Sequence, residues 1–199
     1  NTFQPDFLPT ADVINLYDAA DYRKATYFEA KSVTISGVVY ANTLQVMNKY
    51  PGNPALFSGA TTNYQHFAKL YRIGEQYLIA AEAAYFNGGD ETNARKYLNA
   101  LRVARGLTAT GATGAALLTE IKNERQRELA FEGFRLFDLK RWGEGIKRGV
   151  AQNNAALTVT PSSDFIGLDK PANFDKIVWG IPTNDIIINP NIRPNNPGW

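Results

Sequence analysis

Three glutamates spaced four residues apart are the side chains of this chain that come nearest to forming a catalytic arrangement. Glu124, Glu128 and Glu132 lie within the segment NERQRELAFEGFRLFDLKRWG, residues 123–143. On a helix, side chains four residues apart are neighbours, with Cβ atoms about 5–6 Å apart. Two carboxyl groups separated by about 5–5.5 Å can act as the acid and the nucleophile of a retaining glycosidase. The spacing therefore raises hydrolysis of a glycosidic bond as one hypothesis.

Arginines beside these glutamates favour a structural interpretation instead. The nearest in sequence are Arg125, Arg127 and Arg135. A catalytic pair needs an open cleft and one carboxyl group with a raised pKa, whereas neighbouring arginines keep both carboxyls ionised. The pattern is therefore more typical of an ion-pair network than of an enzyme active site, and we expect no catalysis.

One arginine of this segment falls on the apolar side of the expected helix. Ile121, Arg125 and Leu129 follow one another at intervals of four, which places them on one face. We expect Arg125 to be buried there and bonded to a carboxylate of the apolar helix before it, Glu82 or Glu75.

The remaining composition excludes most other site chemistries. The chain has no cysteine, which removes disulfides, thiolate metal sites and cysteine nucleophiles. A single histidine, His66, excludes a multi-histidine metal site, and no GxSxG, GxGxxG or Walker motif is present. Lys and Arg total 21 and Asp and Glu total 19, so electrostatics indicates neither nucleic acid nor an anionic membrane surface as a partner. We expect no cofactor and no metal.

Helical patterns surround the glutamate segment. Apolar spacing predicts helices over residues 11–30, 68–86, 91–105, 115–132 and 134–145. The helix over 68–86 is apolar almost all round, which is typical of a helix surrounded by protein. The turn Asn87–Asp90 joins it to the next helix, with Asp90 as the expected N-cap, and this pair resembles one tetratricopeptide hairpin.

The other segments differ from these helices in amino-acid composition. Residues 32–50 are β-branched and aromatic around Gly37 and predict a β-hairpin. Residues 51–63 form a Gly/Pro/Asn-rich loop, residues 177–181 a short strand, and residues 184–199 an irregular, proline-blocked end.

Aromatic residues in or near these loops are the candidate ligand-binding residues. They are Tyr40, Tyr50, Phe57 and Tyr64, with Trp179 further along the chain. An exposed aromatic face stacks on the C–H surface of a sugar ring. Tyr50 and Tyr64 bracket the polar loop and are the preferred exposed pair. The alternative for each residue is packing against the domain.

Four segments together resemble the C-terminal half of SusD/RagB-type proteins. They are YRIGEQYLIAAEAAYFNGG (71–89), ARKYLNALRVARG (94–106), the glutamate segment (123–143) and IPTNDIIINPNIRPNNPGW (181–199). The resemblance implies a mainly α fold, with tetratricopeptide-like helix hairpins, a small β-hairpin and long irregular loops. It implies a single SusD-like C-terminal region over 1–199: a helix, hairpin and loop portion (1–67), a helical motif core (68–149) and an irregular tail (150–199). Its motif positions carry over as a structural ion-pair network of Arg125, Glu128, Glu132, Arg135, Asp138 and Glu82.

The same resemblance implies a function. SusD-like proteins are outer-membrane lipoproteins, exposed on the cell surface, that bind oligosaccharides or sometimes peptides without cleaving them. They cover a TonB-dependent, SusC-like transporter, to which the bound nutrient is delivered. Because this sequence begins at Asn1 without a methionine, we expect a lipidated N-terminus and any signal peptide to lie upstream of it. Membrane attachment is then expected only through that anchor. The alternatives are a helical-repeat scaffold that binds a protein partner, a peptide-binding member of the family, and the glycosidase.

Overall fold

The computed structural model of the chain describes residues 7–57, 66–67, 69–147, 149, 151–153 and 169–199. Two compact units make it up: residues 1–133 with 149–160, and residues 134–148 with 161–199. The described residues form seven α-helices and one two-stranded antiparallel sheet. The predicted mainly α fold with a small β-hairpin is therefore confirmed, whereas the predicted division at residues 68 and 150 stays a prediction.

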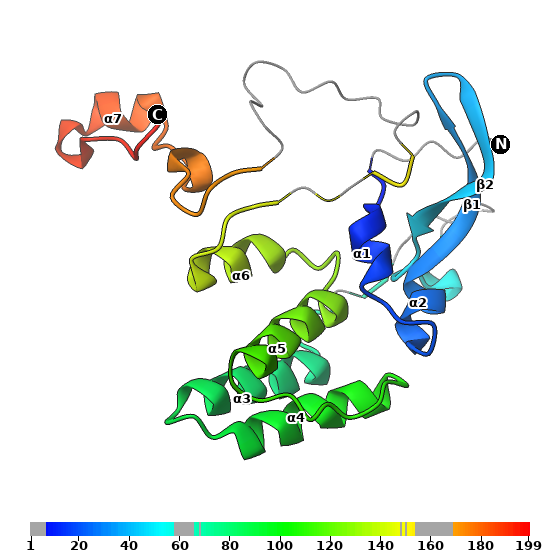
Figure 1. Cartoon of the computed structure of the whole chain (residues 1–199). Helices are drawn as coiled ribbons and strands as arrows, with labels where there is room; N and C mark the ends of the chain where they lie inside the picture. The colour runs from blue at the N-terminus through cyan, green and yellow to red at the C-terminus, as the bar shows by residue number, and fades with distance from the viewer. Residues whose placement is uncertain (1–6, 58–65, 68, 148, 150, 154–168) are drawn as a thin grey trace. The chain divides into compact units, whose positions relative to one another are not determined.

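Three helices build the helical core of the first unit. These are α3 (Ile73–Phe86), α4 (Glu91–Ala104) and α5 (Gly114–Glu128), which pack on one another (Figure 1). The Asp90 side chain accepts a hydrogen bond from the backbone N–H of Asn93 at 3.1 Å, as the predicted N-cap of α4 should. The buried residues between the helices are Leu78, Ala81, Ala94, Leu98, Leu101, Leu117 and Ile121. Apolar burial at helical spacing holds this core together.

The outer side of α3 differs from the prediction. This helix begins at Ile73 rather than at residue 68, and it is not surrounded by protein along its whole circumference. Ile73 is 72% exposed, Ile79 47% and Phe86 63%. Apolar residues of α3 therefore pack into the core on one side of the helix only, and other apolar residues of the helix face solvent.

The predicted helix over residues 11–30 is wrong as a continuous element. The structure has α1 (Ala11–Asn15) and α2 (Tyr22–Tyr27), and the chain enters a strand at Phe28. Asp21 starts the second helix, because its carboxylate accepts the backbone N–H of Arg23 at 3.0 Å. A new cap in mid-segment, and backbone pairing from Phe28 onward, override the apolar spacing that suggested one helix.

The β-hairpin consists of β1 (Phe28–Ile35) and β2 (Val38–Met47), paired antiparallel. The two residues between the strands, Ser36 and Gly37, have φ values of 48° and 81°, which suits a tight two-residue hairpin turn. Val33, Leu44 and Val46 are buried on one face of the hairpin.

The second unit begins with α6 (Arg135–Trp142), which ends at Gly143 in the left-handed conformation. An isolated bridge pairs Ile146 with Lys170, and a 3-10 turn follows at Asp175–Ile177. Among the residues described, no helix combines the length and the hydropathy that crossing a bilayer requires.

The C-terminal segment corrects two predictions. The expected strand over 177–181 does not form, because the Asn195 side chain bonds both the N–H of Ile181, at 2.8 Å, and its carbonyl, at 3.2 Å. A side chain thus takes the place of a neighbouring strand. The segment after it is not wholly irregular, since α7 (Thr183–Ile188) and a 3-10 turn at Pro190–Ile192 form between the prolines.

Candidate functional site

The glutamate row of α5 lies in the interior of the first unit. Glu124 and Glu128 are fully buried, and Glu132, just beyond the helix, has a side chain only 10% exposed. Burial of ionised carboxylates is costly unless cations and hydrogen bonds compensate for the lost water. The surroundings of each glutamate supply those partners.

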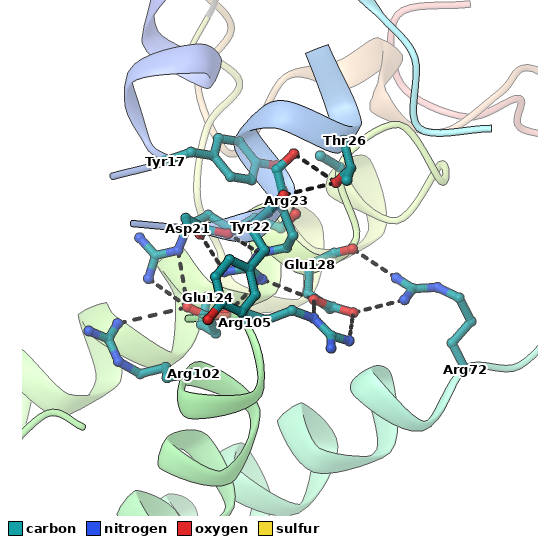
Figure 2. A network of polar contacts seen from close by, with 12 residues as sticks. Tyr17, Asp21, Tyr22, Arg23, Thr26, Arg72, Arg102, Arg105, Glu124 and Glu128 are labelled. Atoms are coloured by element: carbon teal, nitrogen blue, oxygen red, sulfur yellow. Dashed lines mark hydrogen bonds and ion pairs between the residues drawn. The ribbon is translucent and has the colours of Figure 1, made fainter. Parts of the chain in front are cut away.

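Glu128 is the centre of the network, with three arginines on one carboxylate. Arg23 Nη1 donates to it at 2.9 Å, Arg72 Nη1 at 2.8 Å and Arg105 Nη2 at 2.8 Å. Figure 2 shows Arg72 and Arg105 approaching the carboxylate from different elements. Burial alone would raise the pKa of Glu128, but the hydrogen bonds from Arg105 and Arg72 outweigh it and lower that pKa to about 2.

Glu124 is held on the other side of Arg23. Its Oε1 lies 2.7 Å from Arg23 Nη1, and its Oε2 lies 2.7 Å from Arg127 Nη2. Arg23 also pairs with Asp21 at 2.7 Å. Because Arg23 belongs to α2, these contacts tie the N-terminal segment to α5.

Glu132 completes the row through a buried lysine. Its carboxylate lies 2.5 Å from Lys49 Nζ and 2.6 Å from Arg72 Nη2. The same ammonium group donates to the carbonyls of Glu128, at 2.7 Å, and Ala130, at 3.0 Å. Burial lowers the pKa of Lys49 to about 8, although the bond to Glu132 acts in the opposite direction.

This geometry does not fit the glycosidase hypothesis. Neither Glu124 nor Glu128 exposes surface to a substrate, and the pKa of Glu128 is lowered rather than raised. A general acid needs the reverse shift.

The predicted ion-pair residues are found in several places. Arg125 is 6% exposed and its Nη2 lies 3.4 Å from Glu75 Oε1, on α3. Glu82 is buried on α3. Arg135 and Asp138 belong to the second unit, where Asp138 accepts a hydrogen bond from Arg141 at 3.0 Å.

The sequence analysis did not identify most of the cations that form ion pairs with the glutamates. Arg23, Lys49, Arg72 and Arg105 come from other parts of the chain, and none has helical spacing with α5. The signal that pointed to them is indirect: a row of like charges on a buried face requires cations from elsewhere.

One of the predicted ligand-binding aromatics, the half-buried Tyr50, lies beside exposed residues. This group is called the Tyr50 surface and consists of Tyr50, His66 and Lys69, with Phe67 following His66 in the sequence. The rings of Tyr50 and His66 have centroids 5.3 Å apart, and Lys69 Nζ lies 4.8 Å from the centre of the Tyr50 ring. His66 and Lys69 are exposed, and Phe67 is 75% exposed. Partial burial, and next the negative charge of Glu132, raise the pKa of Tyr50 to about 12. Tyr50 itself is half-buried, so part of its side chain faces solvent.

The other predicted aromatics are placed differently. Tyr40 is half-buried against the hairpin core, and Phe57 is half-buried after a 3-10 turn at Pro54–Leu56. Tyr64 lies outside the described residues, so the predicted pair of Tyr50 and Tyr64 stays a prediction. Trp179 is 85% exposed in the second unit.

Comparison with known proteins assigns the class. The model of the SusD family matches residues 17–199. A curated relative, SusD-like protein P2 of Formosa agariphila, is 28% identical over 96% of this chain and 40% of its own length. The chain belongs to the SusD family.

Solved structures agree with the assignment. A protein from Bacteroides vulgatus aligns with a TM-score of 0.65 and 28% identity, over 96% of this chain and 39% of its own. A SusD-like carbohydrate binding protein of the same species aligns with a TM-score of 0.55 and 28% identity, over 72% and 29% of the two chains. The present chain thus spans about two fifths or less of the length of these relatives.

Proposed function

We propose that this chain binds oligosaccharides without cleaving them and passes them to a TonB-dependent, SusC-like transporter. The protein then acts at the cell surface, held on the outer membrane by a lipid anchor. The observation that carries the proposal is the match to the SusD family over residues 17–199. One of its relatives is described as a carbohydrate binding protein.

The Tyr50 surface supports the proposal at the level of residues. The neighbouring rings of Tyr50 and His66 present flat faces of the kind on which sugar rings stack. The Tyr50 ring also lies near two ammonium groups, those of Lys69 at 4.8 Å and Lys49 at 5.8 Å from its centre.

A glycan array, followed by titration calorimetry, tests the proposal. The chain should bind at least one oligosaccharide class and release no reducing sugar from it. Tyr50→Ala should weaken that binding about tenfold or more, because one stacked ring is lost. Phe86→Ala removes an exposed ring on α3 that does not belong to the Tyr50 surface, and it should leave binding unchanged. If the wild-type chain binds none of the plant, host and microbial glycans on the array, the result counts against the proposal.

The apolar outer side of α3 supports a second candidate, binding of a protein or peptide. Ile73, Ile79 and Phe86 expose apolar surface along one helix, as the scaffold alternative requires. A peptide array separates the two candidates: binding of peptides without any glycan, weakened by Ile79→Lys and not by Tyr50→Ala, would favour this one.

A further inference from the structure

The charge around the Tyr50 surface bears on whether the bound oligosaccharide is acidic or neutral. This inference rests on the proposed glycan binding. The surface contains one ammonium group, that of Lys69, which contacts the face of the Tyr50 ring at 4.8 Å. Among the described residues, no carboxylate forms an ion pair with Lys69. Its positive charge is therefore exposed beside the aromatic rings and open to a ligand.

The ion-pair network that contains Glu132 pairs its carboxylates with cations. Ion pairs between described residues join six cations to five carboxylates there, namely Arg23, Lys49, Arg72, Arg102, Arg105 and Arg127 with Asp21, Glu120, Glu124, Glu128 and Glu132. None of these five carboxylates is therefore without a cation partner.

The carboxylate nearest to Tyr50 does not oppose an anionic ligand. Glu132 is bonded by both Lys49, at 2.5 Å, and Arg72, at 2.6 Å, so its charge is compensated. An anionic group placed beside Lys69 then meets an uncompensated cation and a neutralised carboxylate. Aromatic faces and one accessible cation side by side match a ring that carries a carboxylate or a sulfate.

We infer that the Tyr50 surface binds acidic oligosaccharides, in which a uronate carboxylate or a sulfate ester contacts Lys69 while the sugar ring stacks on Tyr50 and His66.

Matched pairs of glycans test the inference on the wild-type chain. Each pair has the same rings with and without charge: oligogalacturonides with their methyl esters, and sulfated galactan oligosaccharides with their desulfated forms. At low ionic strength, the acidic member of at least one pair should bind about three- to fivefold more tightly or better, as expected of one exposed ion pair. Added salt should reduce that margin.

Two lysine variants assign the preference to its residue. Lys69→Met should remove the margin between acidic and neutral members, because the positive charge beside the Tyr50 ring is lost. Lys96→Met is the matched control, because Lys96 is also exposed and its Nζ lies 5.9 Å from the ring of Tyr97 on α4. Circular dichroism and thermal unfolding should be unchanged in both variants.

The outcomes separate this inference from the function on which it rests. Equal binding of both members of every pair, or a margin that survives Lys69→Met, overturns the acidic preference and leaves glycan binding intact. If no acidic member of any pair binds, the acidic preference is overturned as well. The proposed function is overturned only if no neutral glycan binds either.

Discussion

At the scale of single residues, the Glu128 carboxylate is the most constrained group in the first unit. Three arginines hold it, from α2, from the residue before α3 and from the end of α4. Replacing such a buried charge, or displacing it, leaves the arginines without their partner, which typically costs about 3–5 kcal/mol. The space around the carboxylate should therefore be as tightly specified as its charge.

Gly74→Ala tests that constraint. A Cβ on Gly74 would lie 2.5 Å from Glu128 Oε1, and the three arginines prevent the carboxylate from moving away. We expect a loss of about 1–3 kcal/mol in the free energy of unfolding, measured by urea denaturation, although alanine is the better helix former. At Gly111, where a Cβ meets nothing within 4 Å, the same substitution should change stability by less than about 1 kcal/mol. Equal effects at both glycines would show that the carboxylate can shift.

At the scale of elements, Lys49 connects the end of the hairpin to the end of a helix. It follows β2 by two residues, and its ammonium group donates to the carbonyl of Glu128, the last residue of α5. The last carbonyls of a helix lack intrahelical partners and carry partial negative charge, so a cation suits them. The lysine thereby positions the segment that begins with Tyr50.

Lys49→Met keeps most of the unbranched stem of this side chain and removes its ammonium group. Two carbonyls and the Glu132 carboxylate then lose a buried donor, and we expect the free energy of unfolding to fall by about 2–4 kcal/mol. Lys31→Met is the control, because Lys31 pairs with Glu29 at the surface of β1 and should contribute less than about 1 kcal/mol. If both variants unfold at the same urea concentration as the wild-type chain, the lysine does not hold the two elements together.

At the scale of the whole molecule, the network makes folding of the first unit depend on pH. The pKa of Glu128 falls from 4.5 to about 2 on folding, so the unfolded chain binds its proton more readily. The stability that this carboxylate contributes is fully present above pH 4.5 and is lost as the pH falls toward 2. A shift of this size corresponds to about 3 kcal/mol.

Glu128→Gln checks the pH dependence. The variant should be less stable than the wild-type chain at neutral pH, and the difference between them should shrink as the pH falls from about 4.5 toward 2. Urea denaturation across that range measures both curves. Glu29→Gln alters an exposed carboxylate and should retain the wild-type slope. A constant difference between Glu128→Gln and wild type over the whole range would assign the acid sensitivity to other groups.

Local sequence patterns predicted those helices that are marked by an N-cap or by apolar spacing. They did not predict elements whose boundaries depend on residues far away in the sequence. The cap at Asp90 and the buried faces of Ile121 and Leu129 follow from nearest neighbours along the chain. The division of residues 11–30 into two helices and a strand depends on pairing with β2, and the missing strand at 177–181 depends on Asn195. Neither contact has a signature in the spacing of the residues concerned.

The same division holds for the candidate site: some of its features follow from the sequence, and others depend on the tertiary structure. By itself the sequence determined the family, the helical core and the four-residue spacing of the glutamate row, because helical periodicity and motif order are local properties. It also singled out Tyr50 from its position beside a polar loop. Only the tertiary structure decided which cations answer Glu128 and that His66 and Lys69 stand beside Tyr50. The physical reason is that ion pairs and ring contacts act over a few ångströms in space, so chain folding, and not sequence spacing, selects the partners.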